Sequence, residues 1–188
     1  MTAWFVLFLA QAMLVAVRRT DVHRKLGFVG AGLGVAVLVT SLMVTAQLVP
    51  RLAETRGIDG AVAGAPSIVW ANAAALLCFA VFLSSAIALR RRAEVHKRLM
   101  LLAAISVVQP AIARISRWTM FDSIENALFS LMVLSVLILP LLVHDFVSRR
   151  RIHPVTIVGG GLFLGMRAVA IYGIAASDFG RSVVRSLT

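Results

Sequence analysis

Six apolar runs, separated by short polar or basic segments, make up most of this chain. They lie at about 3–17, 26–49, 67–89, 97–118, 126–147 and 154–176. A helix that crosses the hydrocarbon core of a bilayer needs roughly 20 apolar residues, and every run except the first reaches that length. The content of 60% hydrophobic and 14% charged residues is typical of the same class. We therefore predict an all-α polytopic membrane protein with six transmembrane helices in one domain, residues 1–188.

The segment Arg18–Leu26 is repeated 73 residues later as Arg91–Leu99, with five of nine residues identical. A shorter third copy, Arg149–Pro154, follows the fifth run. Each copy joins two apolar runs, so each is expected to be the turn of a helical hairpin. Because the offset covers two runs, the copies keep the same direction. This predicts three parallel hairpins and not an inverted repeat.

Basic residues are concentrated in the three hairpin turns. Twelve of the nineteen Lys and Arg residues follow the first, third and fifth runs. Cytoplasmic loops of membrane proteins carry such an excess, so we predict that these turns are cytoplasmic and that both termini lie outside. The tryptophans Trp4, Trp70 and Trp118 would then lie at the outer interface, which indole rings favour. The glycine-containing stretch Pro50–Pro66 is expected to be an outer loop.

The net charge of +11 does not by itself indicate nucleic acid. The basic residues lie at the ends of apolar runs and not beside stacking aromatic residues, so the predicted partner is the lipid bilayer. Other membrane subunits are a second class of candidate partner. Seventeen arginines against two lysines are typical of a GC-rich bacterial genome. We therefore place the chain in a bacterial plasma (inner) membrane. We interpret the first run as a span and not as a secretory signal, because Arg18 and Arg19 follow it.

All four histidines map to the predicted cytoplasmic side. Three of them open the second, fourth and sixth runs, and one lies a turn before the end of the fifth; they are His23, His96, His153 and His144. Neutral imidazole binds haem iron and transition metals. One b-type haem or one transition metal, held mainly by His23 and His96, is therefore a candidate cofactor. The alternatives are interfacial histidines beside capping residues Asp21 and Glu94, or a proton, quinone or lipid-headgroup role.

Glycines are spaced for close helix packing in two runs. His23, Gly27, Gly30 and Gly34 share one helical stripe, and Gly30 and Gly34 form a GxxxG pair. Gly161 and Gly165 form a second pair. Such pairs let two helices approach closely, which is the interpretation that we favour. A groove for a flat cofactor beside His23 is the alternative.

The sixth run contains an arginine, Arg167, 14 residues beyond His153. A central arginine costs on the order of 2.5–3.5 kcal/mol in a membrane helix, so a buried partner is expected. Asn72, Gln109 and Arg114 map to the same outer half and complete a predicted polar pocket. Arg114 is alternatively expected to extend to the interface. A pocket of this kind would suit a small transporter or a channel-like protein.

The segment Val95–Met100, followed by Gln109, Pro110 and Arg114, resembles a motif of uncharacterised bacterial integral membrane proteins of this size, which implies six spans. Its helix start is also similar to that of small membrane proteins linked to haem-copper oxidase assembly and, more remotely, of cytochrome-b-type membrane reductases. The resemblance covers about 25 residues around His96 and its copy around His23. The reductases hold two haems with histidines on both membrane sides. This chain has none on the outer side, so the resemblance implies one haem at most.

These observations predict a membrane protein and no particular reaction. The sequence has no HExxH motif, no nucleotide-binding glycine loop and no paired carboxylates within a run. It therefore does not predict an enzyme. The first functional hypothesis is a respiratory-membrane accessory or redox-associated protein that holds one haem or metal. The alternatives are a transporter that uses the pocket around Arg167, and a structural or lipid-interacting subunit.

Overall fold

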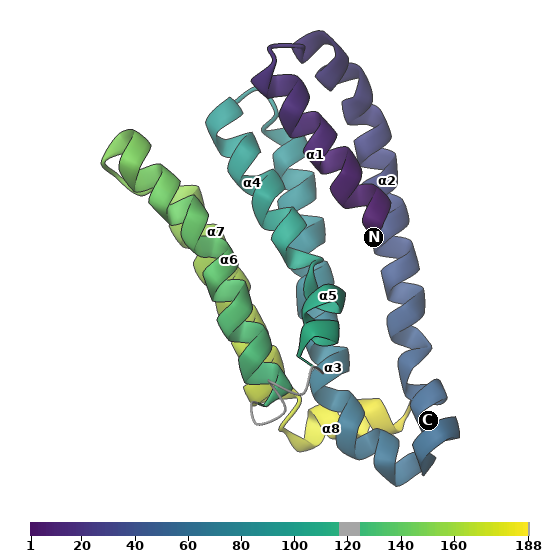
Figure 1. Cartoon of the computed structure of the whole chain (residues 1–188). Helices are drawn as coiled ribbons and strands as arrows, with labels where there is room; N and C mark the ends of the chain where they lie inside the picture. The colour runs from purple at the N-terminus through teal and green to yellow at the C-terminus, as the bar shows by residue number, and fades with distance from the viewer. Residues whose placement is uncertain (117–124, 188) are drawn as a thin grey trace. The chain divides into compact units, whose positions relative to one another are not determined.

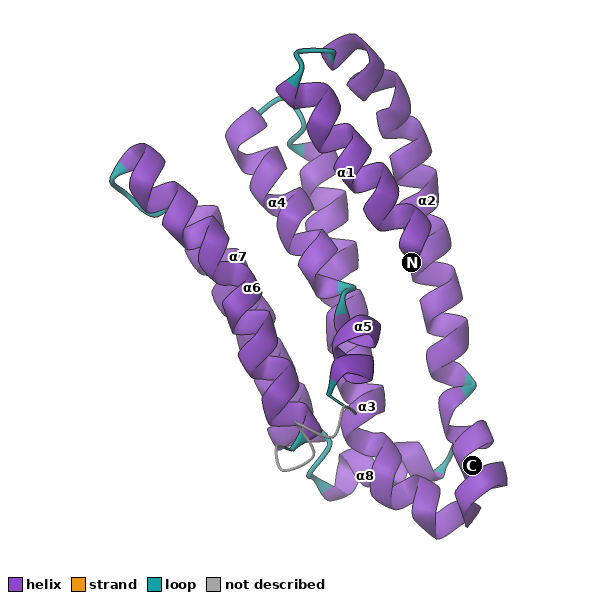
Figure 2. Ribbon diagram, viewed as in Figure 1, coloured by secondary structure: helices purple, strands orange, loops and turns teal. Residues whose placement is uncertain are grey.

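The computed structural model describes residues 1–116 and 125–187, and every regular element in these two ranges is a helix (Figure 2). The predicted all-α class is confirmed for this part of the chain. The contacts between residues group into two compact units, Met1–Met43 and Val44–Thr188. Trp118 and the end of the predicted fourth run lie outside the described residues.

The first unit is a helical hairpin. Helix α1 (Thr2–Ala16) is followed by a short turn in which Arg18 has a φ of 60°, and by α2 (Thr20–Ala46) (Figure 1). A Cβ atom placed on Gly30 would lie 3.8 Å from Leu7 Cδ2, an ordinary van der Waals distance. Of the predicted glycine stripe, Gly30 therefore faces α1, whereas nothing described lies within 4 Å of the Cβ position of Gly27. His23 is half-buried in the first turn of α2.

The second unit begins with the long helix α3 (Leu48–Ala88), which breaks at Gly57, where φ is 75° and ψ is 167°. The prediction of an outer loop at Pro50–Pro66 is therefore wrong, because this stretch is helical on both sides of Gly57. Pro50 lies in the first turn of α3, where a missing N–H group is tolerated. Ala65 is fully buried with Val49 and Val184 in one apolar cluster, and this packing stabilises the helical conformation.

The predicted fourth run forms two helices instead of one. Helix α4 (Ala93–Ser106) and helix α5 (Gln109–Ile115) meet at an angle of 44°. Pro110 lies at the start of α5, where its ring does not interrupt an established hydrogen-bond ladder. After the residues outside the description come α6 (Asn126–Arg149), α7 (Pro154–Ala168), the π-helix η2 (Val169–Ile174) and α8 (Asp178–Arg185).

Helices α3, α4, α6 and α7 pack against one another around a core that contains Phe79, Leu102, Leu134 and Phe163, all without exposed surface. A Cβ atom on Gly159 would lie 2.5 Å from Leu102 Cδ1, so a larger residue there would force the buried Leu102 side chain or α7 to shift. The predicted pair Gly161 and Gly165 does not make such a contact, since nothing described lies within 4 Å of either Cβ position. The close packing uses a different face of α7.

Helix α8 closes the end of the second unit opposite the α3–α4 turn (Figure 1). Trp70 Nε1 donates a hydrogen bond of 3.2 Å to the carbonyl of Gly180, and the rings of Trp70 and Phe179 lie 6.2 Å apart. A Cβ atom on Gly180 would lie 1.9 Å from the carbonyl oxygen of Ile174. Glycine is therefore required where the chain turns from η2 into α8.

Three helical stretches in the described ranges are long and apolar enough to cross a membrane, namely Thr20–Ala88, Asn126–Ser148 and Pro154–Ile174. The first contains both α2 and α3, and the bent pair α4 and α5 makes a fourth candidate if it forms one span. Helix α1 is apolar but has only 15 residues. Large apolar side chains such as Phe146 and Val147 are exposed, as expected for a surface in contact with lipid.

Candidate functional site

A buried ion pair joins α4 to α6 near the hairpin turns of the second unit. Arg98 Nε donates to Asp145 Oδ1 at 3.0 Å and to Asp145 Oδ2 at 3.2 Å, and Arg98 Nη2 also donates to Oδ1. Neither side chain has exposed surface. Arg98 Nη1 donates to the backbone carbonyl of Glu94 at 2.6 Å and to its carboxylate at 2.8 Å.

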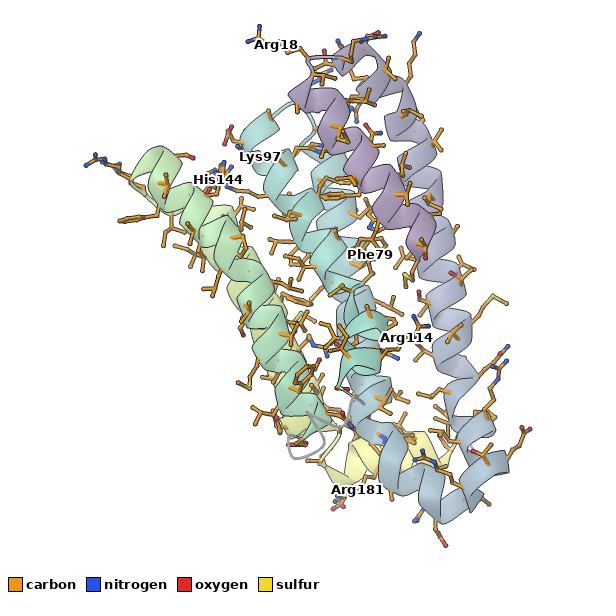
Figure 3. The ribbon with its side chains drawn as sticks, in the orientation of Figure 1. Arg18, Phe79, Lys97, Arg114, His144 and Arg181 are labelled. Atoms are coloured by element: carbon orange, nitrogen blue, oxygen red, sulfur yellow. The ribbon has the colours of Figure 1, made fainter. Side chains whose placement is uncertain are left out.

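Asp145 also holds the start of α7. Its Oδ2 atom accepts a hydrogen bond of 2.5 Å from Thr156 Oγ1 and one of 3.1 Å from the backbone N–H of His153. We call Glu94, Arg98, Asp145, His153 and Thr156 the turn-end network. Because the network joins three helices, the α3–α4 and α6–α7 turns lie at the same end of the second unit. Figure 3 shows Lys97 and His144 at this end and Arg181 at the other.

The hydrogen bonds of two histidines fix which ring nitrogen carries the proton. His96 Nδ1 lies 2.8 Å from the carbonyl oxygen of Ala86, near the end of α3. A carbonyl only accepts, so Nδ1 donates, and Nε2 is the basic nitrogen of the neutral ring. His153 is different, because its Nδ1 accepts a hydrogen bond of 3.2 Å from the N–H of Val155 and caps α7. In the neutral His153 ring the proton is therefore on Nε2.

The other two histidines occupy different environments. The side chain of His144 is 53% exposed, and its Nδ1 lies 3.8 Å from Asp145 Oδ1. His23 belongs to the first unit. Of the three histidines in the second unit, His96 has the hydrogen-bond pattern found in metal-binding histidines, whose second nitrogen donates to a carbonyl or carboxylate. Among the described residues, no group of three or more His, Cys, Asp and Glu side chains could hold a metal ion.

A second buried network surrounds Arg167. Arg167 Nη2 donates to Gln109 Oε1 at 2.9 Å and to Ser130 Oγ at 3.2 Å, and Nη1 donates to the carbonyl of Ala71 at 3.3 Å. Ser130 Oγ in turn donates to Gln109 Oε1 at 2.7 Å. We call Arg167, Gln109, Ser130 and the Ala71 carbonyl the Arg167 network. It joins α3, α5, α6 and α7, and the guanidinium has no exposed surface.

The structure brings together only two of the four residues predicted to form the polar pocket. Gln109 and Arg167 are hydrogen-bonded to each other. Arg114 is exposed (Figure 3), and Asn72 is half-buried with no side-chain hydrogen bond to the described residues. Arg114 follows Gln109 by five residues, which turns it by about 140° around the helix axis. The neighbouring Ala71 supplies its backbone carbonyl in place of the Asn72 amide. The full burial of Arg167 does not favour a water-lined path at this residue.

Of the side chains that bond to these two arginines, the sequence predicted only Gln109, as a neighbour of Arg167. Arg98 was interpreted only as one of the basic residues of a turn, and Ser130 and Thr156 gave no signal. Asp145 is a carboxylate near the end of the apolar run 126–147. Such a group needs a partner because an unpaired carboxylate is costly there, and this requirement is the signal that could have indicated the pair.

Comparisons of the chain with protein-family models, with curated proteins and with solved structures find no match. The local resemblance around His96 therefore stays a prediction. The described fold defines an all-helical protein with apolar helices of membrane-spanning length.

Proposed function

We propose that the chain is a bacterial plasma-membrane protein of six spans in three hairpins, with the basic turns in the cytoplasm and both termini outside. The contacts of Asp145 support this arrangement, because they keep the α3–α4 and α6–α7 turns at one end of the second unit. Exposed basic residues of these turns include Arg91, Arg92 and Arg151. A bias of this kind between the two ends of a bundle is what sets orientation.

The function that we propose is that of a structural, lipid-interacting membrane subunit. The observation that carries it is the buried Arg98–Asp145 pair. These two charges lie inside the bundle and pair with each other, so their role is to hold helices together. The turn arginines differ: Arg91, Arg92 and Arg151 have no carboxylate within 4 Å among the described residues. Near an anionic leaflet each such residue contributes about 1 kcal/mol of attraction to the membrane.

Cysteine labelling in intact cells and in permeabilised cells tests the proposed orientation of the chain in the membrane. Replacement of buried Cys78 by Ser gives a background without cysteine, into which Arg91→Cys or Asp178→Cys is introduced. The two positions lie at opposite ends of the second unit. We expect an impermeant maleimide to label the Asp178→Cys variant in intact cells and the Arg91→Cys variant only after permeabilisation. Labelling of the Arg91→Cys variant from outside would contradict the proposal.

A second candidate function is a redox-associated subunit with one haem on the cytoplasmic side. The observation that favours it is the hydrogen bond from His96 Nδ1 to Ala86, which makes Nε2 the basic nitrogen. An absorption spectrum and metal analysis of the purified chain separate the two candidates. Bound haem gives a Soret band that is lost in His96→Ala and kept in His153→Ala, since Nδ1 of His153 caps α7. A colourless, metal-free protein would contradict the haem candidate and leave the structural one.

A further inference from the structure

Helices α3, α4 and α7 line an open groove of about 350 Å³ on the surface of the second unit. Its walls include Val81, Phe82 and Ser85 of α3, Leu99 of α4, and Val158 and Leu162 of α7. Apart from the Ser85 hydroxyl these side chains are apolar. Val158 and Leu162 are 67% and 46% exposed, so the groove opens sideways, toward the region that lipid would occupy.

The groove begins beside the hairpin turns. Its α7 wall runs from Pro154 to Leu162, which corresponds to about 12 Å of helix. This length is close to the thickness of one leaflet, about 15 Å of the hydrocarbon core. At the turn side, the hydrogen bond from His96 to the Ala86 carbonyl joins α3 to α4 directly after Ser85. The groove is therefore bounded by a polar contact at one end and continues along the helices at the other.

The charges near the turn side of the groove are mainly positive. Lys97 and Arg98 are neutralised by the carboxylates of Glu94 and Asp145. In contrast, Arg91 and Arg92 precede α4 and Arg151 precedes α7, and all three are exposed without a carboxylate partner in the described ranges. An apolar groove with guanidinium groups at one end complements a molecule that has an anionic head and a hydrocarbon tail.

We propose that this groove binds one acyl chain of an anionic glycerophospholipid, whose phosphate is held by Arg91, Arg92 and Arg151. Charge complementarity supports an anionic lipid, because the exposed guanidinium groups at the turn side would lie beside the phosphate of a lipid whose acyl chain fills the apolar walls. The inference rests on the proposed function, since it requires the basic turns to face an anionic leaflet.

Native mass spectrometry of the full chain in detergent tests the site with phosphatidylglycerol and phosphatidylcholine. We expect phosphatidylglycerol to bind more tightly, by up to about fivefold for each arginine that contacts it. The triple variant Arg91→Gln, Arg92→Gln and Arg151→Gln should lose this preference. A matched triple variant at the opposite end, Arg51→Gln, Arg56→Gln and Arg181→Gln, should keep it. Equal affinities for the two lipids in the unmodified chain, or equal loss in both triple variants, would overturn the proposal.

A variant that fills the groove tests the acyl-chain part of the site. Val158→Trp should weaken binding of both lipids, whereas Val143→Trp, on an exposed position of α6 outside the groove, should leave binding unchanged. Equal effects of the two variants would overturn the proposal that the groove binds the acyl chain. A dimer mass that disappears in Val158→Trp would instead identify a second copy as the occupant and overturn the lipid proposal. Maleimide labelling of the Arg91→Cys variant from outside the cell refutes the proposed function. The expected labelling combined with equal binding of the two lipids refutes this inference alone.

Discussion

Arg98 and Asp145, 47 residues apart in sequence, meet inside the second unit with no exposed surface on either side chain. The pair joins α4 to α6, and Asp145 extends the connection to α7 through Thr156. A buried ion pair is weak evidence for stability, because taking two charges out of water is costly. It does fix which helix faces lie together, since each charge requires the other.

Removal of one partner from this pair should be strongly destabilising. We expect Arg98→Leu and Asp145→Leu each to lower the free energy of unfolding by about 3 kcal/mol, because the remaining charge would stay buried and unpaired. The double variant should lose less than either single one. Reversible unfolding of the full chain in mixed micelles of detergent and SDS measures these differences. Lys97→Leu, which removes an exposed ion pair with Glu94, is the control and should have little effect.

The two glycine positions of α7 should respond differently to the same substitution. A methyl group on Gly159 would lie 2.5 Å from Leu102 Cδ1, so Gly159→Ala should displace the buried Leu102 side chain or α7 and destabilise the protein by about 1–3 kcal/mol. Gly161→Ala adds its methyl group to open space and should be neutral or slightly stabilising, because alanine favours the helix. Thermal denaturation in detergent measures both. A larger loss for Gly161→Ala would contradict the described packing of α7.

The Arg167 network predicts a non-additive pair of substitutions. Gln109→Leu removes an acceptor from a buried guanidinium and should lower stability by about 2 kcal/mol. Arg167→Met combined with Gln109→Leu should restore much of this loss, since both polar partners are then gone. Asn72→Leu, at the predicted pocket position that has no hydrogen bond in the described chain, should change little. The same unfolding assay tests all three variants, and a strictly additive double variant would contradict the network.

The attachment of α8 requires a glycine at position 180. Gly180→Ala would bring a methyl group against the Ile174 carbonyl, so α8 should detach from α3 and expose Trp70. We expect a red shift of Trp70 fluorescence, measured with Trp4 and Trp118 replaced by Phe. Ser182→Ala, on an exposed position of α8, is the control and should leave the emission unchanged. An unshifted spectrum in Gly180→Ala would contradict the described contact.

Much of the helical pattern could be predicted from the sequence, because long apolar runs interrupted by basic turns leave little alternative to helices. Residues 126–147 and 154–176 correspond closely to α6 and to α7 with η2. The helical conformation of Pro50–Pro66 could not be predicted, since it depends on the packing of Ala65 against Val184, more than a hundred residues away. Glycine and proline are local signals for a loop, and here tertiary contacts outweigh them.

The candidate site was only partly predictable for a related reason. The burial of Arg167 and its proximity to Gln109 follow from the cost of a charge in an apolar run and from similar depth. The exposure of Arg114 depends on the rotation of α5 after the bend, which the sequence does not specify. The pairing of Arg98 with Asp145 requires α4 and α6 to be neighbours, and nothing in either run identifies the other.

The π-helical turn Val169–Ile174 places one more residue between Arg167 and α8 than a regular helix would need. Loss of one residue from this turn would rotate everything beyond it by about 100° around the axis of α7 and shorten the path by about 1.5 Å. Phe179 and Val184 would then point away from Trp70 and Val49. The extra residue of the π-helical turn therefore sets the position of α8, and we expect a single-residue deletion in this turn to remove the contacts of α8 with α3.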